Sequence, residues 1–256
     1  MPWECTMVGN TALCLRNPVA RAPIGISDEA RGYPLVHKPI QVLLIGDPSE
    51  NLPGARQETE QIANAYAGHA EIDCTTLIGS EATFDRVVRE LLRGNYDVVH
   101  FAGHAWYDAQ EAYLALHDNT KFRANELRSL LSPRPPAILL LNSHYTAFIP
   151  PGVRIDEQRP PTIGGEESMI DPAIRGKGGF TEVAATAGVG ALIGCFGSPD
   201  DQLAADIGID VHVELLKGTP VAVALHKARL ASLAKDPADK AGMLYILSGY
   251  PELALY

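Results

Sequence analysis

Two short apolar runs, each ending in a polar residue beside Gly or Ser, carry the residues best suited to chemistry. Val98–Phe101 leads through Ala-Gly to His104, and Ile138–Leu141 leads through Asn-Ser to His144. Apolar runs of this length, bounded by turn residues, are typical of buried strands in a parallel sheet. The carboxyl ends of neighbouring parallel strands open into one crevice, so we expect positions 104 and 144 to face each other. A pair of a His and a nucleophile is built in this way, but here both positions are histidine.

Neighbouring residues offer other chemistry at this crevice. Ser143 would point to the opposite face of its strand, where small-residue packing or a backbone hydrogen bond is its expected role. Cys195 ends the next predicted strand and is expected to be a buried apolar filler, although a nucleophilic role stays open. His100, His104 and His144 together would suit Zn²⁺ with an open fourth position. We expect His100 instead to satisfy a buried hydrogen bond, and we expect no bound metal.

The composition excludes several function classes. The chain of 256 residues has a net charge of -10 and no basic run, which argues against a nucleic-acid surface. Its longest apolar segments are far shorter than the roughly 20 residues that span a bilayer. The N-terminus has neither the charged nor the apolar region of a secretory signal, so we expect a cytoplasmic protein. The cysteines show no metal or disulfide spacing and are expected to be reduced thiols; they are Cys5, Cys14, Cys74 and Cys195.

Strand-type and helix-type segments alternate along most of the chain. This rhythm predicts an α/β fold, with a mostly parallel central sheet covered by helices on both faces. One helix is expected to open at Thr219-Pro220, with Pro at the first helical position. The predicted strands are Gln41–Gly46, Ile72–Ile78, Asp97–Phe101, Tyr113–His117, Ala137–Ser143 and Val189–Cys195. The predicted helices are Ala55–Gly68, Thr83–Arg93, Ala124–Leu131, Gly178–Gly188, Gln202–Lys217, Val221–Ala234 and Gly242–Ser248.

Two stretches lie outside this alternation. The pattern over residues 1–36 predicts an N-terminal leader segment with short strands or irregular structure, and it alternates over Thr11–Leu15. Residues 149–177 form a long connection rich in Pro, Gly and charge. A loop of this length is usually functional or disordered, and this one leaves almost directly from position 144. We therefore expect one domain over residues 37–256, with residues 149–177 as a substrate or activation loop or an ordinary surface loop.

A series of short motifs follows in a fixed order along nearly the whole chain. They are Pro2-Trp3-Glu4, Leu43–Gly46, Leu52-Pro53-Gly54-Ala55 with Glu58, Val99–His104, Leu114-Ala115-Leu116, Leu141-Asn142-Ser143, Tyr145-Thr146, Ala187–Ala191, Gly218–Ala222 and Gly249-Tyr250-Pro251. Each motif alone is weak, and their order and spacing make the pattern specific. In this order the chain resembles the CHAT domain, a branch of the caspase–separase–gingipain superfamily of cysteine peptidases.

This resemblance implies a three-layer caspase-like fold and a peptide-bond hydrolase with a His–Cys dyad. The family's catalytic His corresponds to His104, and its Cys nucleophile corresponds to position 144. The thiolate would attack the scissile carbonyl while the imidazole manages the proton of the thiol and of the leaving amine. Backbone N–H groups of Gly103 and of residue 144 would hold the oxyanion. The substrate, a protein or peptide, would lie extended along the crevice as an added strand.

The chain departs from the family pattern at its most important residue, because His144 cannot supply a thiolate. Three explanations stay open: a replacement that silences an active peptidase, a natural pseudo-enzyme, or another residue that has taken over. Two function classes follow. One is a CHAT-type cysteine endopeptidase that is inactive as written, and the other is a non-catalytic module that binds a peptide or partner protein in the same crevice.

Specificity would depend on acidic residues near the crevice. The superfamily often cleaves after a basic residue, and Asp200 and Asp201 follow the predicted strand Val189–Cys195. Asp200 has an alternative role as the N-cap of the next helix. Related domains place this segment behind an upstream sensor or repeat domain, so such a regulator is a candidate partner. We expect no cofactor.

Overall fold

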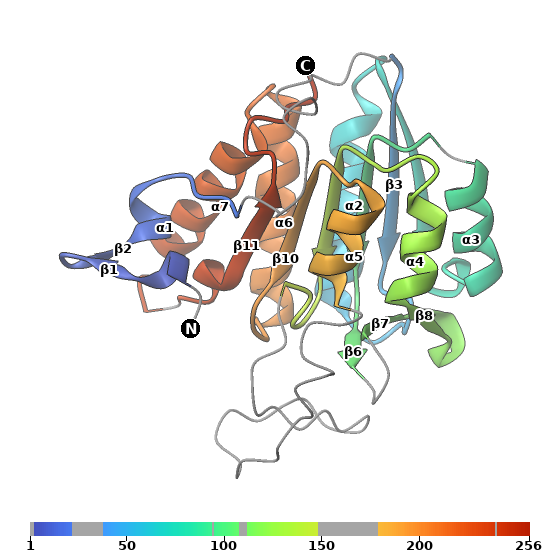
Figure 1. Cartoon of the computed structure of the whole chain (residues 1–256), viewed down its shortest axis with the longest axis horizontal. Helices are drawn as coiled ribbons and strands as arrows, with labels where there is room; N and C mark the ends of the chain where they lie inside the picture. The colour runs from blue at the N-terminus through green and yellow to red at the C-terminus, as the bar shows by residue number, and fades with distance from the viewer. Residues whose placement is uncertain (1–2, 22–37, 94, 108–111, 148–178, 239) are drawn as a thin grey trace, which may run out of the picture.

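A six-stranded sheet forms the centre of the molecule in the computed structural model (Figure 1). The structure describes residues 3–21, 38–93, 95–107, 112–147, 179–238 and 240–256. In the order β11-β10-β9-β5-β3-β4, all neighbours are parallel except β11 and β10. The strands are β3 (Ile40–Gly46), β4 (Ile72–Ile78), β5 (Val98–Ala102), β9 (Ile138–Asn142), β10 (Ala191–Cys195) and β11 (Tyr245–Gly249). The predicted mostly parallel sheet is confirmed.

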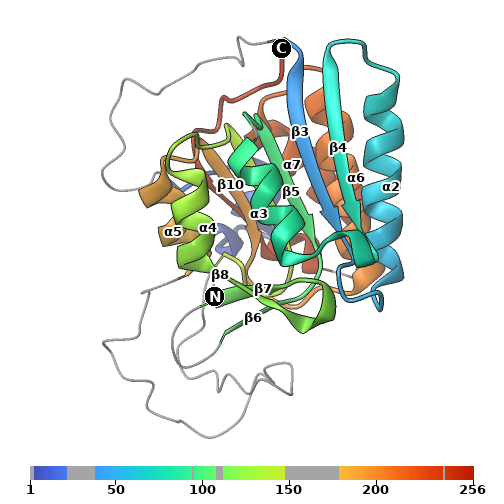
Figure 2. The ribbon, with the colours of Figure 1, turned by 90° about the vertical axis from the view of Figure 1, so that its right-hand side faces the viewer.

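Helices cover both faces of this sheet, as Figure 2 shows edge-on. One face is covered by α3 (Phe84–Arg93), α4 (Ala124–Leu131) and α5 (Phe180–Ala187). The other is covered by α2 (Pro53–Ala67), α6 (Asp201–Leu216) and α7 (Val221–Lys235). Every residue of β5 and β9 is buried, because both sides of these central strands face a helix layer. The three-layer α/β architecture predicted from the sequence is present.

The predicted helix Gly242–Ser248 is wrong. A short 3₁₀ helix, η5 (Ala241–Leu244), is followed by strand β11, which runs antiparallel to β10 at the edge of the sheet. Tyr-Ile-Leu favours an extended conformation, and pairing with β10 satisfies its backbone groups. The pairing partner lies some fifty residues upstream, so the local pattern did not reveal it.

Small departures occur elsewhere. The predicted strand Tyr113–His117 is β7 (Ala112–Ala115), which belongs to a separate antiparallel sheet with β6 (Ala105–Tyr107) and β8 (Lys121–Arg123). His117 instead begins η4 (His117–Asn119). Pro220 is the N-cap of α7 and not its first helical residue. The predicted loop at 149–177 lies outside the described residues.

The N-terminal segment packs against the domain (Figure 1). It contains η1 (Trp3–Cys5), a hairpin of β1 (Met7–Val8) and β2 (Thr11–Ala12), and helix α1 (Leu13–Arg16), which contacts α7. The alternating pattern over Thr11–Leu15 is therefore a strand only in its first two residues. Arg21 forms a parallel bridge with Ser248 on β11. The remainder of the predicted leader, residues 1–2 and 22–36, lies outside the described residues.

Candidate active site

Positions 104 and 144 follow the adjoining ends of β5 and β9. The parallel register of these strands pairs Ala102 with Asn142, so residues 104 and 144 each lie two positions beyond the last pair. The two strand ends are joined further by the Ser143 hydroxyl, which donates to the Gly103 carbonyl at 2.5 Å. Ser143 is buried, which confirms the predicted backbone hydrogen bond. The crevice expected from the sequence thus has the two histidines on neighbouring strands.

A constrained turn follows position 144. Tyr145 has a φ of 56°, which is unusual for a bulky residue, and its N–H donates to the Gly197 carbonyl at 3.1 Å. The Thr146 hydroxyl donates to the Leu141 carbonyl at 2.8 Å and accepts from the Cys195 N–H at 2.9 Å. These contacts tie the turn to β9 and β10. Backbone strain of this kind is typical of functional sites, where surrounding contacts hold one geometry.

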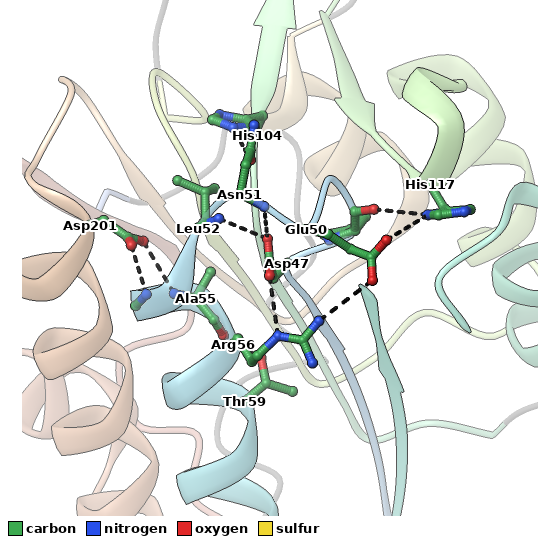
Figure 3. A network of polar contacts seen from close by, with 12 residues as sticks. Asp47, Glu50, Asn51, Leu52, Ala55, Arg56, Thr59, His104, His117 and Asp201 are labelled. Atoms are coloured by element: carbon green, nitrogen blue, oxygen red, sulfur yellow. Dashed lines mark hydrogen bonds and ion pairs between the residues drawn. The ribbon is translucent and has the colours of Figure 1, made fainter. Parts of the chain in front are cut away.

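His104 is held by the loop between β3 and α2 (Figure 3). Its Nε2 lies 3.0 Å from Oδ1 of Asn51, so Nε2 carries the proton and Nδ1 is left to accept one. Its ring also stacks on Trp106, with centroids 5.7 Å apart. Burial lowers the pKa of His104, while the charges of Asp47 and Asp201 oppose that shift. The ring is therefore a neutral base in a fixed orientation at neutral pH.

Asp47 fixes the loop that carries Asn51. This buried carboxylate accepts from the N–H groups of Asn51 and Leu52 through Oδ1, each at 2.9 Å (Figure 3). Its Oδ2 accepts from Arg56 Nε at 3.3 Å. Its own N–H donates to the Ala102 carbonyl at 2.9 Å, which joins the loop to the end of β5. The position of His104 thus depends on a carboxylate far from it in the sequence.

His144 has a different environment. The Ser198 hydroxyl lies 3.2 Å from Nδ1 and 3.3 Å from Nε2 of its ring. An oxygen that is nearly equidistant from both nitrogens is not aligned with either lone pair, so the contact is not a nucleophile–base hydrogen bond. Burial lowers the pKa of His144, and the nearby His104 lowers it further. The two rings therefore coexist as neutral imidazoles.

The two candidate specificity carboxylates bind backbone N–H groups. Asp200 is the N-cap of α6, and its side chain accepts from the Gln202 N–H at 3.0 Å, which confirms the alternative role predicted for it. Asp201 accepts from the Gly54 N–H at 2.7 Å and from the Ala55 N–H at 3.1 Å (Figure 3). It caps α2 from another helix. Asp201 is also brought to the crevice, whereas Asp200 faces solvent.

A small hollow lies beside His144. Its lining includes His144, Gly103, Asn142, Ser143, Glu58 and Asp201. About 30 Å³ of it is open to water-sized molecules, which is room for one or two waters. The Gly103 N–H donates to the Asn142 carbonyl at a long 3.4 Å. Gly103, one of the expected oxyanion donors, therefore lines the hollow, but its N–H is turned toward β9.

The floor of this hollow is a buried carboxyl–amide pair. Asn142 Nδ2 donates to Glu58 Oε1 and to the Ala204 carbonyl, both at 2.7 Å. Because a carbonyl only accepts, Ala204 fixes which end of the amide is the NH₂ group. The Tyr245 hydroxyl donates to Asn142 Oδ1 at 2.6 Å. Asn142, two residues before position 144, is thus held on three sides.

Three further buried groups extend this pair into the core. His100 Nε2 lies 3.2 Å from Glu58 Oε1, and His100 Nδ1 lies 3.1 Å from His212 Nε2. His212 Nδ1 lies 2.5 Å from the Tyr66 hydroxyl. One direction of donation fits the two hydrogen bonds, with Tyr66 donating to His212 and His212 to His100. His100 Nε2 then faces Glu58, although among the described residues it forms no hydrogen bond. Burial raises the pKa of Glu58 and lowers that of His100 to about 3.

These contacts correct one alternative drawn from the sequence. His100 is completely buried with its ring engaged in the core, so it does not join His104 and His144 in a three-histidine metal site. The described residues contain no group of three or more metal-binding side chains. The expected buried hydrogen bond of His100 is confirmed. His117, at the start of η4, is partly exposed, and its Nδ1 lies 3.3 Å from the Pro48 carbonyl oxygen.

Asn51, Ser198 and Glu58 are site residues to which the sequence alone assigned no role. Asn51 and Ser198 lie in loops whose course only the tertiary structure defines. Glu58 carried a signal, since it is an acidic residue in the motif at the start of α2 and its side chain faces the apolar side of that helix. A buried acid on an apolar helix face is rarely present without a partner.

The chain belongs to the CHAT domain family, whose sequence profile matches residues 1–246. Its fold is similar to that of the Arg-specific cysteine proteinase gingipain R, with a TM-score of 0.60 and 14% identity over 88% of this chain and 49% of that chain. A complex of the RgpB pro- and mature domains from Porphyromonas gingivalis gives 0.57 at 14% identity, covering 88% and 50%. The separase–securin complex of Saccharomyces cerevisiae gives 0.55 at 12% identity, covering 84% and 13%.

The fold is therefore that of caspase-like cysteine peptidases. The chain spans about half the length of the gingipain structures that it matches, and much less of the separase chain. No curated protein sequence matches it. None of the described helices is both long enough and apolar enough to cross a membrane.

Proposed function

We propose that this domain carries the site of a caspase-like cysteine endopeptidase in which His144 occupies the nucleophile position, so that the chain as written does not cleave peptide bonds. The register of β5 and β9, which brings positions 104 and 144 to adjoining strand ends, carries this proposal. Cys195 is completely buried, and burial raises its pKa to about 12, so it offers no replacement thiolate. Ser198 is not aligned with either ring nitrogen of His144.

A cysteine at position 144 would complete the reaction. His104 takes the thiol proton, and the thiolate then attacks the scissile carbonyl carbon. As the peptide C–N bond breaks, His104 returns the proton to the leaving amine, and water hydrolyses the resulting thioester. The N–H groups of residue 144 and Gly103 would hold the oxyanion, with Gly103 leaving its long bond to the Asn142 carbonyl.

The substrate that we propose is a protein cut after a basic residue. Support comes from Asp201, whose carboxylate lines the hollow, and from the Arg-specific gingipain R, whose fold is similar. The hollow is too small for an arginine side chain, so the basic group would sit at its rim near Asp201. Separase, another similar fold, was solved with securin, which supports a protein partner.

The experiment compares the chain as written with His144→Cys on fluorogenic peptides that carry Arg, Lys or Asp before the scissile bond. We expect cleavage only by His144→Cys, with the Arg or Lys peptides cut faster than the Asp peptide. Adding His104→Ala to that variant should lower kcat by about 10² to 10⁴, the usual contribution of a general acid–base group. Ser198→Ala in the same background is the matched control and should leave kcat within about threefold, since among the described residues the Ser198 hydroxyl contacts the His144 ring that was replaced.

Cleavage by the chain as written would contradict the proposal. If His144→Cys does not cleave but the chain binds extended peptides, the domain is the alternative, a non-catalytic binding module. That candidate is favoured by one observation, the pair of neutral imidazoles where a thiolate is needed. We also propose a cytoplasmic location and control by an upstream sensor or repeat domain. Equal peptidase activity of His144→Cys with and without such a domain would refute the proposal that the domain regulates it.

A further inference from the structure

Two cysteines outside the candidate active site lie opposite each other at the base of the N-terminal hairpin. The hairpin pairs Met7 with Ala12 and Val8 with Thr11. The Leu13 N–H donates to the Thr6 carbonyl at 2.9 Å, which continues the same register by one pair. Just beyond this pair, Cys5 ends η1 and Cys14 lies in the first turn of α1, and these two elements contact each other. Both are buried, and their thiols contact each other.

This arrangement matches what a disulfide requires. A disulfide joins Cβ atoms about 3.5–4.5 Å apart. Because the two thiols already contact each other, closing a disulfide requires only a small approach of the two segments. The His226 ring lies 3.0 Å from the Cys14 carbonyl through Nδ1 and fixes that side of the pair to α7.

A buried cation faces the two thiols. Arg229 of α7 is 1% exposed, and its Nη2 donates to the Tyr245 carbonyl at 2.5 Å. In the described part of the chain, its Nε and Nη1 have no hydrogen-bond partner. An unpaired buried guanidinium is costly, and an anion beside it would offset that cost. Glu4, the nearest carboxylate, is already bound by Arg21 at 2.6 and 3.0 Å, so a thiolate is the anion that remains.

The acid–base behaviour of the pair agrees with this assignment. Contact with the Cys5 thiol and the charge of Arg229 lower the pKa of Cys14 to about 7, against the opposing effect of burial. Contact with Cys14 and burial raise the pKa of Cys5. The charge of Glu4 raises both. Cys14 therefore carries the nucleophilic sulfur, and the Cys5 thiol keeps its proton.

We propose that Cys5 and Cys14 form a reversible dithiol–disulfide pair, with Cys14 as the attacking thiolate, that is oxidised by small-molecule disulfides. The Cys14 thiolate attacks one sulfur of the oxidant, and the oxidant's S–S bond breaks to release one thiolate. Cys5 then loses its proton and attacks the Cys14 sulfur of the mixed disulfide. The second small thiolate leaves, so two protein thiols are oxidised and one small disulfide is reduced to two thiols.

Reagents reach the pair through the hairpin itself. Trp3, Met7 and Val8 are exposed apolar side chains on this segment. A hairpin of two strands with so little cover is marginally stable, so local opening is expected to be frequent. The buried Cys195 is the last residue of β10 in the main sheet, where no such opening exposes it.

The test incubates the full chain with oxidised glutathione, blocks the remaining thiols with iodoacetamide and digests with trypsin without reduction. Cleavage after Arg16 leaves both cysteines on one peptide, residues 1–16, while Cys74 and Cys195 fall on others. We expect this peptide to be lighter by two hydrogens and unalkylated, and to return to the dithiol form with a reducing agent. Cys195 should remain reduced.

Matched single variants assign the roles. In Cys5→Ser we expect a stable glutathione adduct on Cys14, because the resolving thiol is absent and the serine hydroxyl replaces it as a donor to the Cys14 sulfur. In Cys14→Ser we expect Cys5 to react at least about tenfold more slowly, because it lacks the thiolate. The proposal is overturned if both cysteines of peptide 1–16 remain reduced while the same concentration of oxidised glutathione modifies Cys74. Equal reactivity of the two single variants overturns the assignment of Cys14 as the attacking sulfur.

Discussion

Replacing Asp201 with Asn tests whether this residue, which also lines the hollow, holds the start of α2 as a structural cap. Helix α2 begins after Leu52, whose side chain has no oxygen to cap the first N–H groups. Asp201, on α6, supplies both acceptors, with Oδ2 on the Gly54 N–H and Oδ1 on the Ala55 N–H. Asp201→Asn keeps one acceptor and turns an NH₂ group toward the other N–H.

The expected loss follows from these contacts. A hydrogen bond to a charged group contributes about 1.5–3 kcal/mol, and a carboxylate near a helix N-terminus adds about 0.3–1 kcal/mol. Asp201→Asn removes one such bond and the charge, so the free energy of unfolding should fall by about 2–4 kcal/mol. A loss of 2 kcal/mol lowers the folding constant about 30-fold.

The matched control is the adjacent residue. Asp200 makes one cap contact, with the Gln202 N–H at 3.0 Å, and faces solvent. Asn is as good an N-cap as Asp, so Asp200→Asn should change stability by less than about 0.5 kcal/mol. Urea unfolding followed by circular dichroism measures both variants against the unchanged chain.

Two results would refute this reasoning. If Asp201→Asn lowers the free energy of unfolding by less than about 0.5 kcal/mol, the carboxylate does not hold the start of α2. If Asp200→Asn lowers the free energy of unfolding as much as Asp201→Asn does, the loss of stability comes from the charge of this loop and not from the contact between α6 and α2.

Further predictions concern the buried groups beneath the site. Gly208→Ala should destabilise the protein by about 3 kcal/mol or more despite the better helix propensity of Ala, because the added Cβ would overlap Glu58 Oε1. Gly68→Ala, whose Cβ would meet nothing nearer than 3.9 Å, is the control, and equal urea midpoints for the two variants would contradict the reasoning. The ring signals of His100 and His212 should not titrate between pH 8 and about 5, because burial lowers both pKa values, that of His100 to about 3. The unfolded chain protonates these rings near pH 6.5, so their contribution to stability falls as the pH drops from about 6.5 toward 3; an NMR titration midpoint above 6 for either ring would refute this.

Much of the fold follows from local sequence patterns. The apolar runs before His104 and His144 correspond to β5 and β9, because strands buried on both faces need continuous apolar residues. Their parallel pairing follows from the helices between them. The two candidate site positions could therefore be predicted from the sequence. The segment Tyr245–Gly249 could not, because its strand conformation depends on pairing with β10.

The roles of the polar residues needed the tertiary structure. Asp200 could be recognised as a cap, since its acceptor contact is two residues away. Asp201 could not, because the N–H groups that it binds are 146 and 147 residues away in the sequence. Asn51 likewise gains its role only when the β3–α2 loop folds over His104.

The sequence by itself determined the alternation of strands and helices, the ends of the two central strands and the histidine at position 144. These features depend on side-chain type and on contacts between near neighbours along the chain, which the order of residues specifies directly. The tertiary structure alone decided which polar groups meet: Asn51 with His104, Glu58 with Asn142, and Cys5 with Cys14 beside Arg229. Most of these partners are far apart in the sequence, and hydrogen bonds and ion pairs act only over a few ångströms, so their pairing exists only once the chain has folded.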